Sequence, residues 1–183
     1  ARPRMDLVLI SGYFVPTEQG CTELADLRHG GVMVRVLTNS YASTDVGVVH
    51  SGYAPCRKVL LQKGIDLFEM PAPDDAPKRS SSKFIRSGSK RSRRYSGKSL
   101  HAKVYVVDRR QFYVGSANFD PRSAHLNTEL GFVIESAVLS ERLAHAFELA
   151  ARNSYQLRLL PDGALSWTDA RDDNPVAELI EPG

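Results

Sequence analysis

The chain has 183 residues, 42% of them hydrophobic, which is enough for one domain with its own core over 1–183. It has no run of about 18 apolar residues to span a bilayer, no signal-peptide pattern at its start, and only two cysteines, without metal-site spacing or a disulfide framework. The net charge of +3 is uneven, because nine Lys or Arg and no acid lie between Lys78 and Lys98, which leaves −6 for the remainder.

Hydrophobic periodicity and glycine stops predict five elements in the first 70 residues. They are strands over 5–11, 32–38 and 65–70, and helices over 18–28 and 46–63. The strand–helix–strand–helix–strand order predicts a parallel portion of β-sheet with helices packed on it.

Aromatic residues follow the first of these strands. Tyr13 and Phe14, in the sequence YFVP (13–16), come directly after its carboxyl end. Open α/β sheets bind ligands at that position, so both side chains are candidates for substrate contact. The alternative is an aromatic plug over the core.

The helix over 46–63 carries a second pair of candidates. His50 and Tyr53 are three residues apart and therefore share one face. A single histidine on a helix is usually structural, and the alternative is that the pair lines a substrate channel. Arg57 and Lys58 on the same helix are expected to face solvent.

The segment 71–98 differs from the rest in being basic, rich in Pro, Ser and Gly, and without periodicity. Three interpretations compete: a solvated linker, a nucleic-acid contact, or a contact with anionic lipid headgroups. In the lipid case Phe84, Ile85 and Tyr95 would enter the membrane interface.

The residues 100–107 alternate and are rich in valine, which predicts a strand. Alternation places His101 and Lys103 on the same face, roughly 7 Å apart along the strand. Asp108 falls on the other face, so we expect it to act in the structure and not in chemistry.

A second short strand runs into Gly115, and Ser116 and Asn118 follow as two neutral hydrogen-bond donors. An imidazole, an ammonium and two neutral donors suit an oxyanion, and a phosphoryl group fits best. Neutral imidazole can attack phosphorus, while the ammonium and the two donors stabilise charge on the phosphoryl oxygens. Glu129 is a candidate to hold the second imidazole nitrogen.

The last third of the chain predicts further regular structure. A turn at 120–123 contains Arg122, which can reach either a phosphate or a carboxylate. Beyond it the patterns predict a strand over 129–135, a helix over 138–152, and a hairpin of 155–160 with 164–168.

The spacing HxKxxxxDxxxxxxGSxN resembles the HKD motif of the phospholipase D superfamily. The matching residues are His101, Lys103, Asp108, Gly115, Ser116 and Asn118, and the acid of the family falls on Glu129. FDPRSAHLNTELGFVIES (119–136) further resembles the bacterial cardiolipin synthase branch, its C type in particular, as do YFVP and 37–53. The resemblance implies an α/β phospholipase D-like domain, with a mixed β-sheet flanked by helices on both faces.

The resemblance also implies an activity. One histidine attacks a phosphodiester to form a phosphohistidine, a second HKD histidine protonates the leaving alcohol, and an acceptor alcohol or water completes the reaction without metal or cofactor. We therefore expect a phosphatidyltransferase that makes cardiolipin from phosphatidylglycerol, or from phosphatidylethanolamine plus phosphatidylglycerol. The alternatives are a hydrolase of the same superfamily, either a phospholipase D or a nuclease, and a non-catalytic membrane-binding domain.

Only one HKD motif is present, and the chain starts at Ala1 without a methionine. This predicts the second HKD half of a longer enzyme, with the basic insertion 71–98. The expected partners are a phospholipid substrate, an anionic membrane surface, and either the N-terminal HKD half or a second copy of the chain. The lipid branch makes nucleic acid an unlikely partner, favours substrate contact at YFVP, and predicts a peripheral protein of the bacterial inner membrane.

Overall fold

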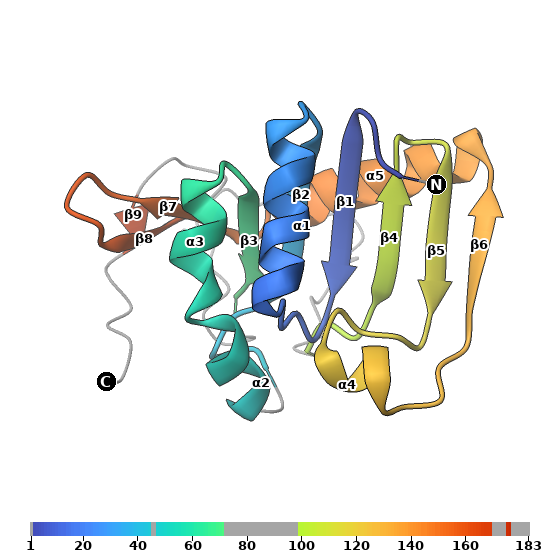
Figure 1. Ribbon diagram of the computed structural model, residues 1–183. Helices are drawn as coiled ribbons and strands as arrows, with labels where there is room; N and C mark the ends of the chain where they lie inside the picture. The colour runs from blue at the N-terminus through green and yellow to red at the C-terminus, as the bar shows by residue number, and fades with distance from the viewer. Residues whose placement is uncertain (1, 45–46, 72–98, 170–174, 177–183) are drawn as a thin grey trace, which may run out of the picture.

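The computed structural model describes residues 2–44, 47–71, 99–169 and 175–176, which form a sheet with helices packed on it (Figure 1). The strands are β1 Asp6–Ser11, β2 Met33–Asn39, β3 Asp66–Met70, β4 Lys103–Val107, β5 Gln111–Gly115, β6 Gly131–Glu135, β7 Tyr155–Leu159, β8 Leu165–Asp169 and β9 Pro175–Val176. The helices are α1 Glu18–His29, α2 Gly47–Tyr53, α3 Cys56–Gln62, α4 Pro121–His125 and α5 Ala137–Ala151.

The strand order in the sheet is β6-β5-β4-β1-β2-β3-β7-β8-β9. β1, β2 and β3 are parallel, with Leu9 opposite Val36 and Val36 opposite Leu67, and every other pairing is antiparallel. The predicted parallel portion and the predicted mixed sheet are both confirmed.

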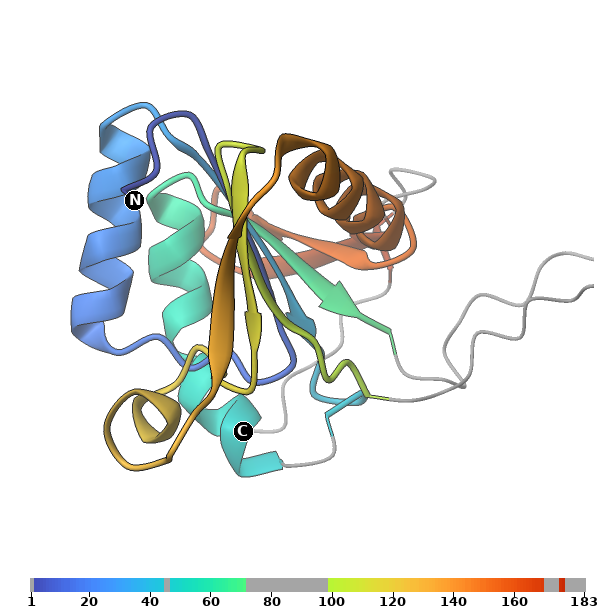
Figure 2. The ribbon, with the colours of Figure 1, turned by 90° about the vertical axis from the view of Figure 1, so that its right-hand side faces the viewer.

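Helices cover both faces of the sheet, as Figure 2 shows edge-on. Leu7 and Leu9 of β1 pack into the core beneath α1 and α3, while Val8 between them packs into the core beneath α5 with Phe147. The alternation of a buried strand thus joins two apolar layers, which is the physical basis of an α/β fold. The predicted fold class is confirmed.

One helix was predicted where two exist. The range 46–63 contains α2 and α3, and the chain is interrupted at Ala54 and Pro55. Proline lacks the N–H that would continue the ladder, and its ring disfavours helical backbone at the residue before it.

The parallel strands all end at one end of the sheet, which we call the carboxyl end. β4 begins there opposite the end of β1, and β5 finishes there opposite the start of β6. The short helices α2 and α4 lie beyond this end (Figure 1). The sheet therefore gathers the motif residues and both short helices in one region.

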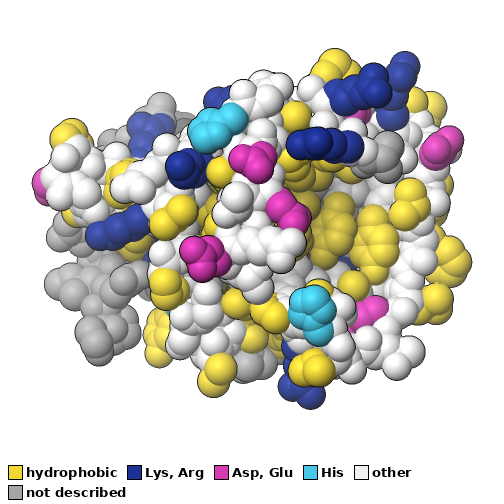
Figure 3. Space-filling view, viewed as in Figure 1, with side chains coloured by type: hydrophobic (Ala, Val, Ile, Leu, Met, Phe, Trp, Pro, Cys, Tyr) yellow, Lys and Arg dark blue, Asp and Glu magenta, His cyan; other side chains and the backbone are white. Residues whose placement is uncertain are grey.

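α1 covers β1 and β2 and leaves one face of β4, β5 and β6 without a helix over it (Figure 1). Hydrophobic side chains gather on this open face, which is hollowed (Figure 3). The hollow is a groove of about 330 Å³ lined by side chains that include Tyr105, Tyr113, Val107 and Val133.

The basic segment predicted to contact lipid lies, from 72 to 98, outside the described residues. Among the helices of the described ranges, none combines the length and the apolar character that crossing a membrane requires.

Candidate active site

His101 and Lys103 lie together at the carboxyl end. Lys103 is the first residue of β4, opposite Ser11, and the exposed His101 comes two residues before it. The Lys103 side chain is buried, its ammonium donates to the His101 carbonyl oxygen at 3.0 Å, and it lies 5.9 Å from the centroid of the Tyr13 ring. The same ring meets the His101 imidazole edge-on, with 6.3 Å between centroids. The predicted pair and Tyr13 therefore form one cluster.

The buried amide of Asn39, which the sequence patterns did not single out, fixes the backbone just before His101. Its Nδ2 lies 3.0 Å from each of three oxygens, namely Gly12 O, Ser99 Oγ and Leu100 O. Its Oδ1 accepts from the Leu100 N–H at 2.9 Å. Both backbone polar groups of Leu100 are thus bonded to one side chain, which explains why β4 begins at Lys103 and not at residue 100. The available signal was the place of Asn39 at the carboxyl end of a parallel strand.

Gly12 allows the close approach of the loop after β1 to the segment before β4. A Cβ at this position would lie 2.1 Å from the carbonyl oxygen of Leu100. The Gly12 N–H also donates to Ala102 O at 3.1 Å, so the two segments are joined on both sides of His101. A larger residue would displace Leu100 from its bonds with Asn39.

Two tyrosines shape the turn that follows β5. A Cβ on Gly115 would lie 2.3 Å from the Tyr113 hydroxyl, and a Cβ on Gly131 would lie 2.2 Å from the Tyr113 ring, so this ring covers the paired glycines. The Tyr113 hydroxyl accepts from Ala117 N at 3.3 Å, and Tyr105, stacked on Tyr113, donates to Ala117 O at 2.9 Å. Both backbone groups of Ala117 are therefore held, in the middle of the Gly-Ser-Ala-Asn turn.

Glu129 is bonded to Ser116 and not to His101. Ser116 Oγ donates to Glu129 Oε2 at 2.5 Å, and Asn127 Nδ2 donates to Oε1 at 3.1 Å. The bond from Ser116, then that from Asn127, and to a smaller extent the charge of Lys103, lower the pKa of Glu129. The predicted hydrogen bond between Glu129 and the imidazole is absent from the described residues, because pairing of β5 with β6 brings Glu129 next to the residue that follows β5.

Asn118 lines a separate cavity. Its backbone N–H donates to Ser123 Oγ at 3.2 Å, and its buried Oδ1 has no hydrogen-bond partner in the part of the chain that the structure describes. The side chain lines a mainly apolar cavity of about 390 Å³ between the start of α1 and α4, which neither His101 nor Lys103 lines. Donation from Asn118 to a phosphoryl group therefore stays a prediction.

Asp108 lies at the far end of β4 from the cluster, roughly 17 Å from Lys103 at about 3.3 Å per residue. Its backbone is left-handed, with φ of 51°. Its carboxylate accepts from the backbone N–H groups of Arg4, Met5 and Asp6 at 2.7–3.1 Å. Burial raises its pKa, but these hydrogen bonds outweigh burial and the net shift is downward. This placement agrees with a structural role.

Phe14 and Tyr53, both candidates for substrate contact, are core residues here. Phe14 is 1% exposed and packs between Tyr53 and Phe119, with ring centroids 5.7 and 5.2 Å away. Burial and then the charge of Glu69 raise the pKa of Tyr53, whose ring is equally enclosed. Neither side chain offers surface to a substrate in this arrangement, so the prediction for Phe14 is corrected to the aromatic plug and that for Tyr53 to a structural role.

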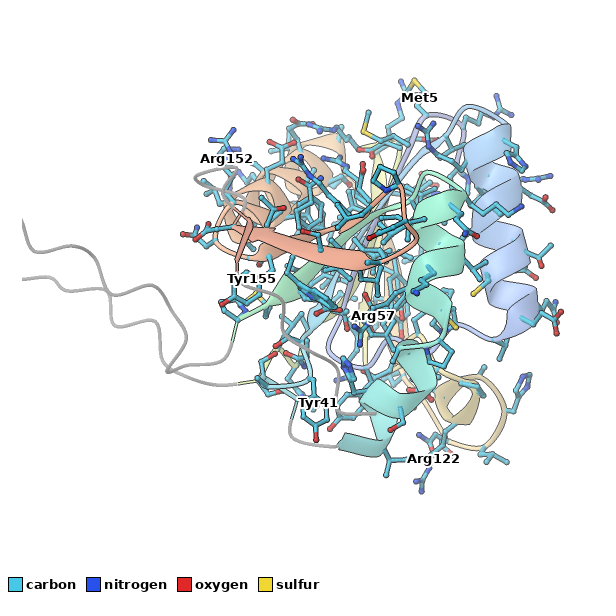
Figure 4. All side chains as sticks on the ribbon, turned by 90° about the vertical axis from the view of Figure 1, so that its left-hand side faces the viewer. Met5, Tyr41, Arg57, Arg122, Arg152 and Tyr155 are labelled. Atoms are coloured by element: carbon cyan, nitrogen blue, oxygen red, sulfur yellow. The ribbon has the colours of Figure 1, made fainter. Side chains whose placement is uncertain are left out.

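His50 belongs to a buried polar cluster rather than to the site. Its Nε2 contacts the Arg57 guanidinium, which lies 3.4 Å from the Glu69 carboxylate, and Trp167 Nε1 donates to Glu69 at 2.9 Å. Burial, and then the charge of Arg57, lower the pKa of His50 to about 4. Arg57 was expected in solvent but points into the molecule (Figure 4), because the carboxylate and the rings of Tyr53 and Trp167 surround it.

Arg122 projects from α4 into solvent at the carboxyl end (Figure 4). Across the described ranges no group of three or more His, Cys, Asp or Glu side chains is placed to hold a metal ion. The groups that the structure brings together are thus an accessible imidazole, a buried ammonium bonded to the carbonyl oxygen of the same histidine, and a tyrosine ring near both.

A sequence model of the family described as cardiolipin synthase, phospholipase D-like domain, matches residues 3–150. The chain belongs to this family. Of its motif residues, His101, Lys103, Gly115, Ser116 and Asn118 lie on or beside β4 and β5 at the carboxyl end, whereas Asp108 lies at the other end of β4.

This phospholipase D-like domain is also similar to known relatives and solved structures. Cardiolipin synthase C of Escherichia coli strain K12 is 40% identical over 181 residues, which is 98% of this chain and 37% of that protein. The fold resembles the phospholipase D family member Nuc of Salmonella typhimurium, with a TM-score of 0.58, 16% identity and coverage of 85% of this chain and 84% of that one. It also resembles phosphatidylserine synthase of Haemophilus influenzae, with a TM-score of 0.59, 15% identity and coverage of 86% and 35%. The domain therefore spans little more than a third of the E. coli relative.

Proposed function

We propose that this domain supplies the nucleophilic half of a phosphatidyltransferase that makes cardiolipin. The observation that carries the proposal is the pairing of an accessible His101 with the buried Lys103 ammonium at the carboxyl end. The 40% identity to a cardiolipin synthase over nearly the whole chain supports a lipid phosphodiester as the substrate.

In the first step a nitrogen of the His101 imidazole forms a bond to phosphorus of the donor phospholipid. The bond from phosphorus to the leaving alkoxide oxygen breaks, and that oxygen takes a proton from a general acid. Lys103 offsets the negative charge on the phosphoryl oxygens, where a fixed cation in a partly enclosed site is most effective. Because Ser116 is bonded to Glu129, it holds the turn beside the phosphoryl group and needs no free hydroxyl for that task.

In the second step the hydroxyl of phosphatidylglycerol attacks phosphorus and displaces the imidazole. Its proton returns to the general acid of the first step, which is now deprotonated and acts as a base. The proposal assigns that acid to a second HKD histidine, in the other half of the parent enzyme or in a second copy of this chain. Its support is that the chain has one HKD motif and spans 37% of the E. coli relative. The parent enzyme would act as a peripheral protein at the bacterial inner membrane.

Hydrolysis is the second candidate, and the exposure of His101 favours it, because water can reach a phosphoryl group on this nitrogen. Product analysis separates the two. The parent enzyme is incubated with phosphatidylglycerol vesicles, and cardiolipin plus glycerol indicates transfer, whereas phosphatidic acid indicates hydrolysis.

The matched variants for this assay are His101→Ala and His125→Ala, since His125 is also exposed at the carboxyl end but lies on α4. We expect His101→Ala to abolish both products and His125→Ala to leave them within about twofold, because a nucleophile that forms the covalent bond has no substitute. Full activity of the His101→Ala enzyme would refute the proposal.

A further inference from the structure

Among the large hydrophobic side chains that the structure describes, the three most exposed all lie at the carboxyl end. They are Val48 at 82%, Leu126 at 81% and Leu130 at 70%. Exposed apolar residues are common on any surface when they are scattered singly. Here the three side chains with the highest exposed fractions lie at the same end of the molecule as His101, which indicates that they share a role there.

Each of the three comes from a different segment of that end. Val48 is on α2, Leu126 ends α4, and Leu130 comes just before β6. Leu130 is tied to the candidate site directly, because its N–H donates to Ser116 Oγ at 2.9 Å. A fourth exposed apolar residue, Tyr41, lies at the same end (Figure 4). We call Val48, Leu126 and Leu130 the rim.

A described cation lies at the same end as the rim. Arg122 is exposed on α4, at the same end as Tyr41 (Figure 4). The described chain leaves this end after β3 and returns to it before β4, and the sequence between holds nine Lys or Arg and no acid from Lys78 to Lys98. Apolar side chains beside cations are the composition that binds the interface of an anionic bilayer.

We propose that the rim is a membrane-docking surface, with which the carboxyl end enters the headgroup region of an anionic phospholipid bilayer. This inference rests on the proposed function, because it presents His101 to phosphodiesters that are still in the membrane. The phosphate of a phospholipid lies at headgroup depth, which is where apolar rim side chains would place the imidazole and Lys103. Donor lipid can then react without leaving the bilayer.

A protein partner would favour another part of the surface. The apolar residues of β6, Phe132, Val133 and Ile134, are consecutive on an edge strand of the described sheet, and Val133 lines the open groove. Exposed apolar side chains on an edge strand, next to an apolar groove, suit another protein surface. The rim residues are instead separated along the chain on short helices and loops, which suits shallow insertion into lipid.

The first test is vesicle binding by the 183-residue chain. The rim variant is Val48→Gln with Leu126→Gln and Leu130→Gln. The matched control replaces three exposed apolar residues at the opposite end, Met5→Gln with Met33→Gln and Val138→Gln, whose exposures are 64, 50 and 66%. All six residues are at the surface, and circular dichroism with urea unfolding checks that both variants fold.

We expect the rim variant to lose at least about tenfold in partition onto phosphatidylcholine vesicles that contain phosphatidylglycerol. Burial of each methylene-sized group contributes about fourfold to partition, so insertion of even two such groups accounts for this loss. The control should change by less than about twofold. Wild-type binding should fall when phosphatidylglycerol is omitted and when salt is raised, because the cations contribute as well.

The fluorescence of tryptophan introduced at the rim gives an independent measure of how deeply the rim enters the bilayer. Trp167 is the only tryptophan and is buried, so its emission is a constant background. Leu126→Trp and Leu130→Trp should be quenched by phospholipids brominated on the acyl chains, whereas Met33→Trp at the opposite end should not.

Three results would overturn the docking surface: a wild-type chain that ignores anionic vesicles, a rim variant that binds as the wild type does, or equal quenching at Leu126→Trp and Met33→Trp. A rim variant with unchanged vesicle binding that turns a dimer into a monomer by light scattering would reassign the rim to a protein interface. Binding is measured without turnover, so rim-dependent binding in an enzyme that makes neither cardiolipin nor phosphatidic acid would refute the proposed function alone.

Discussion

Replacing Asn39 with aspartate tests whether one buried amide holds the backbone that carries His101. The substitution keeps the shape of the side chain and keeps Oδ1, which accepts from Leu100 N at 2.9 Å. It exchanges the donating NH2 group for an oxygen that faces Gly12 O and Leu100 O at 3.0 Å. An attractive pair of contacts thereby becomes a repulsive one in a buried place.

The cost follows from the carbonyl groups that lose their donor. A buried acceptor left without a partner costs about 1–3 kcal/mol, and two are affected, so Asn39→Asp should lower the free energy of unfolding by about 3 kcal/mol. At a urea slope of about 2 kcal/mol per M, the midpoint of unfolding should fall by about 1.5 M. Protonation restores one donor, so the pKa of the new carboxyl should rise. The deficit is then smallest at low pH and grows as pH rises through the folded-state pKa.

The assay is urea unfolding followed by circular dichroism, with Asn153→Asp as the matched control. Asn153 is exposed, and its amide donates only to Leu149 O at 2.7 Å in the described structure, so its replacement should change stability by less than about 0.5 kcal/mol. A second readout is the NMR position of the His101 imidazole resonances, which should move in Asn39→Asp and stay in the control. An unchanged midpoint would refute the stability argument, and lost stability with unmoved His101 resonances would refute the positioning role.

Three further predictions concern the cluster, the far end of β4 and the buried histidine. Lys103→Met, which keeps the aliphatic stem, should lower phosphatidyl transfer by the parent enzyme on the order of 100-fold with little change in the urea midpoint; transfer above half of wild type would contradict the assigned charge. Asp108→Ala should cost about 2 kcal/mol of unfolding free energy while transfer is retained, because three backbone N–H groups lose their acceptor; loss of turnover in a normally folded protein would contradict it. His50, with its pKa lowered from 6.5 to about 4, is protonated first in the unfolded chain. Stability should therefore be complete above about pH 6.5 and fall by up to about 3 kcal/mol as pH drops toward 4, and His50→Gln should flatten this slope in urea titrations; an equal slope in both proteins would place its origin elsewhere.

Sequence patterns predicted the features that depend on residues close together in the chain. The period of two along residues 100–107 separates the faces of Lys103 and Asp108, and the structure places these side chains at opposite ends of β4 with different partners. The order of strands and helices in the first 70 residues fixes a parallel sheet, because such crossovers leave few alternatives. The break at Pro55 was also a local signal, and the prediction of a single helix over 46–63 overlooked it.

Partners distant in sequence could not be derived in this way. Asn39 bonds to Leu100, 61 residues later, and Trp167 bonds to Glu69, 98 residues earlier. The position of Glu129 depends on the register of β5 with β6, which a pattern along one strand does not contain. The surroundings of Arg57 have the same origin, since the rings and carboxylate that enclose it come from separate strands and a helix.

The exposure of His101 bears on the choice between transfer and hydrolysis. Once a phosphoryl group is on this imidazole, water competes with the acceptor alcohol, and water is present at about 55 M. An acceptor held in place gains an effective concentration far above that value, but only when water is kept from the same position. Among the described residues, Tyr13 contacts the imidazole edge-on and Lys103 bonds to the His101 carbonyl oxygen, and His101 remains exposed. On the proposed mechanism, transfer therefore requires a cover beyond the described residues, and the second HKD half and the bilayer surface are two covers that would also bring a reactant.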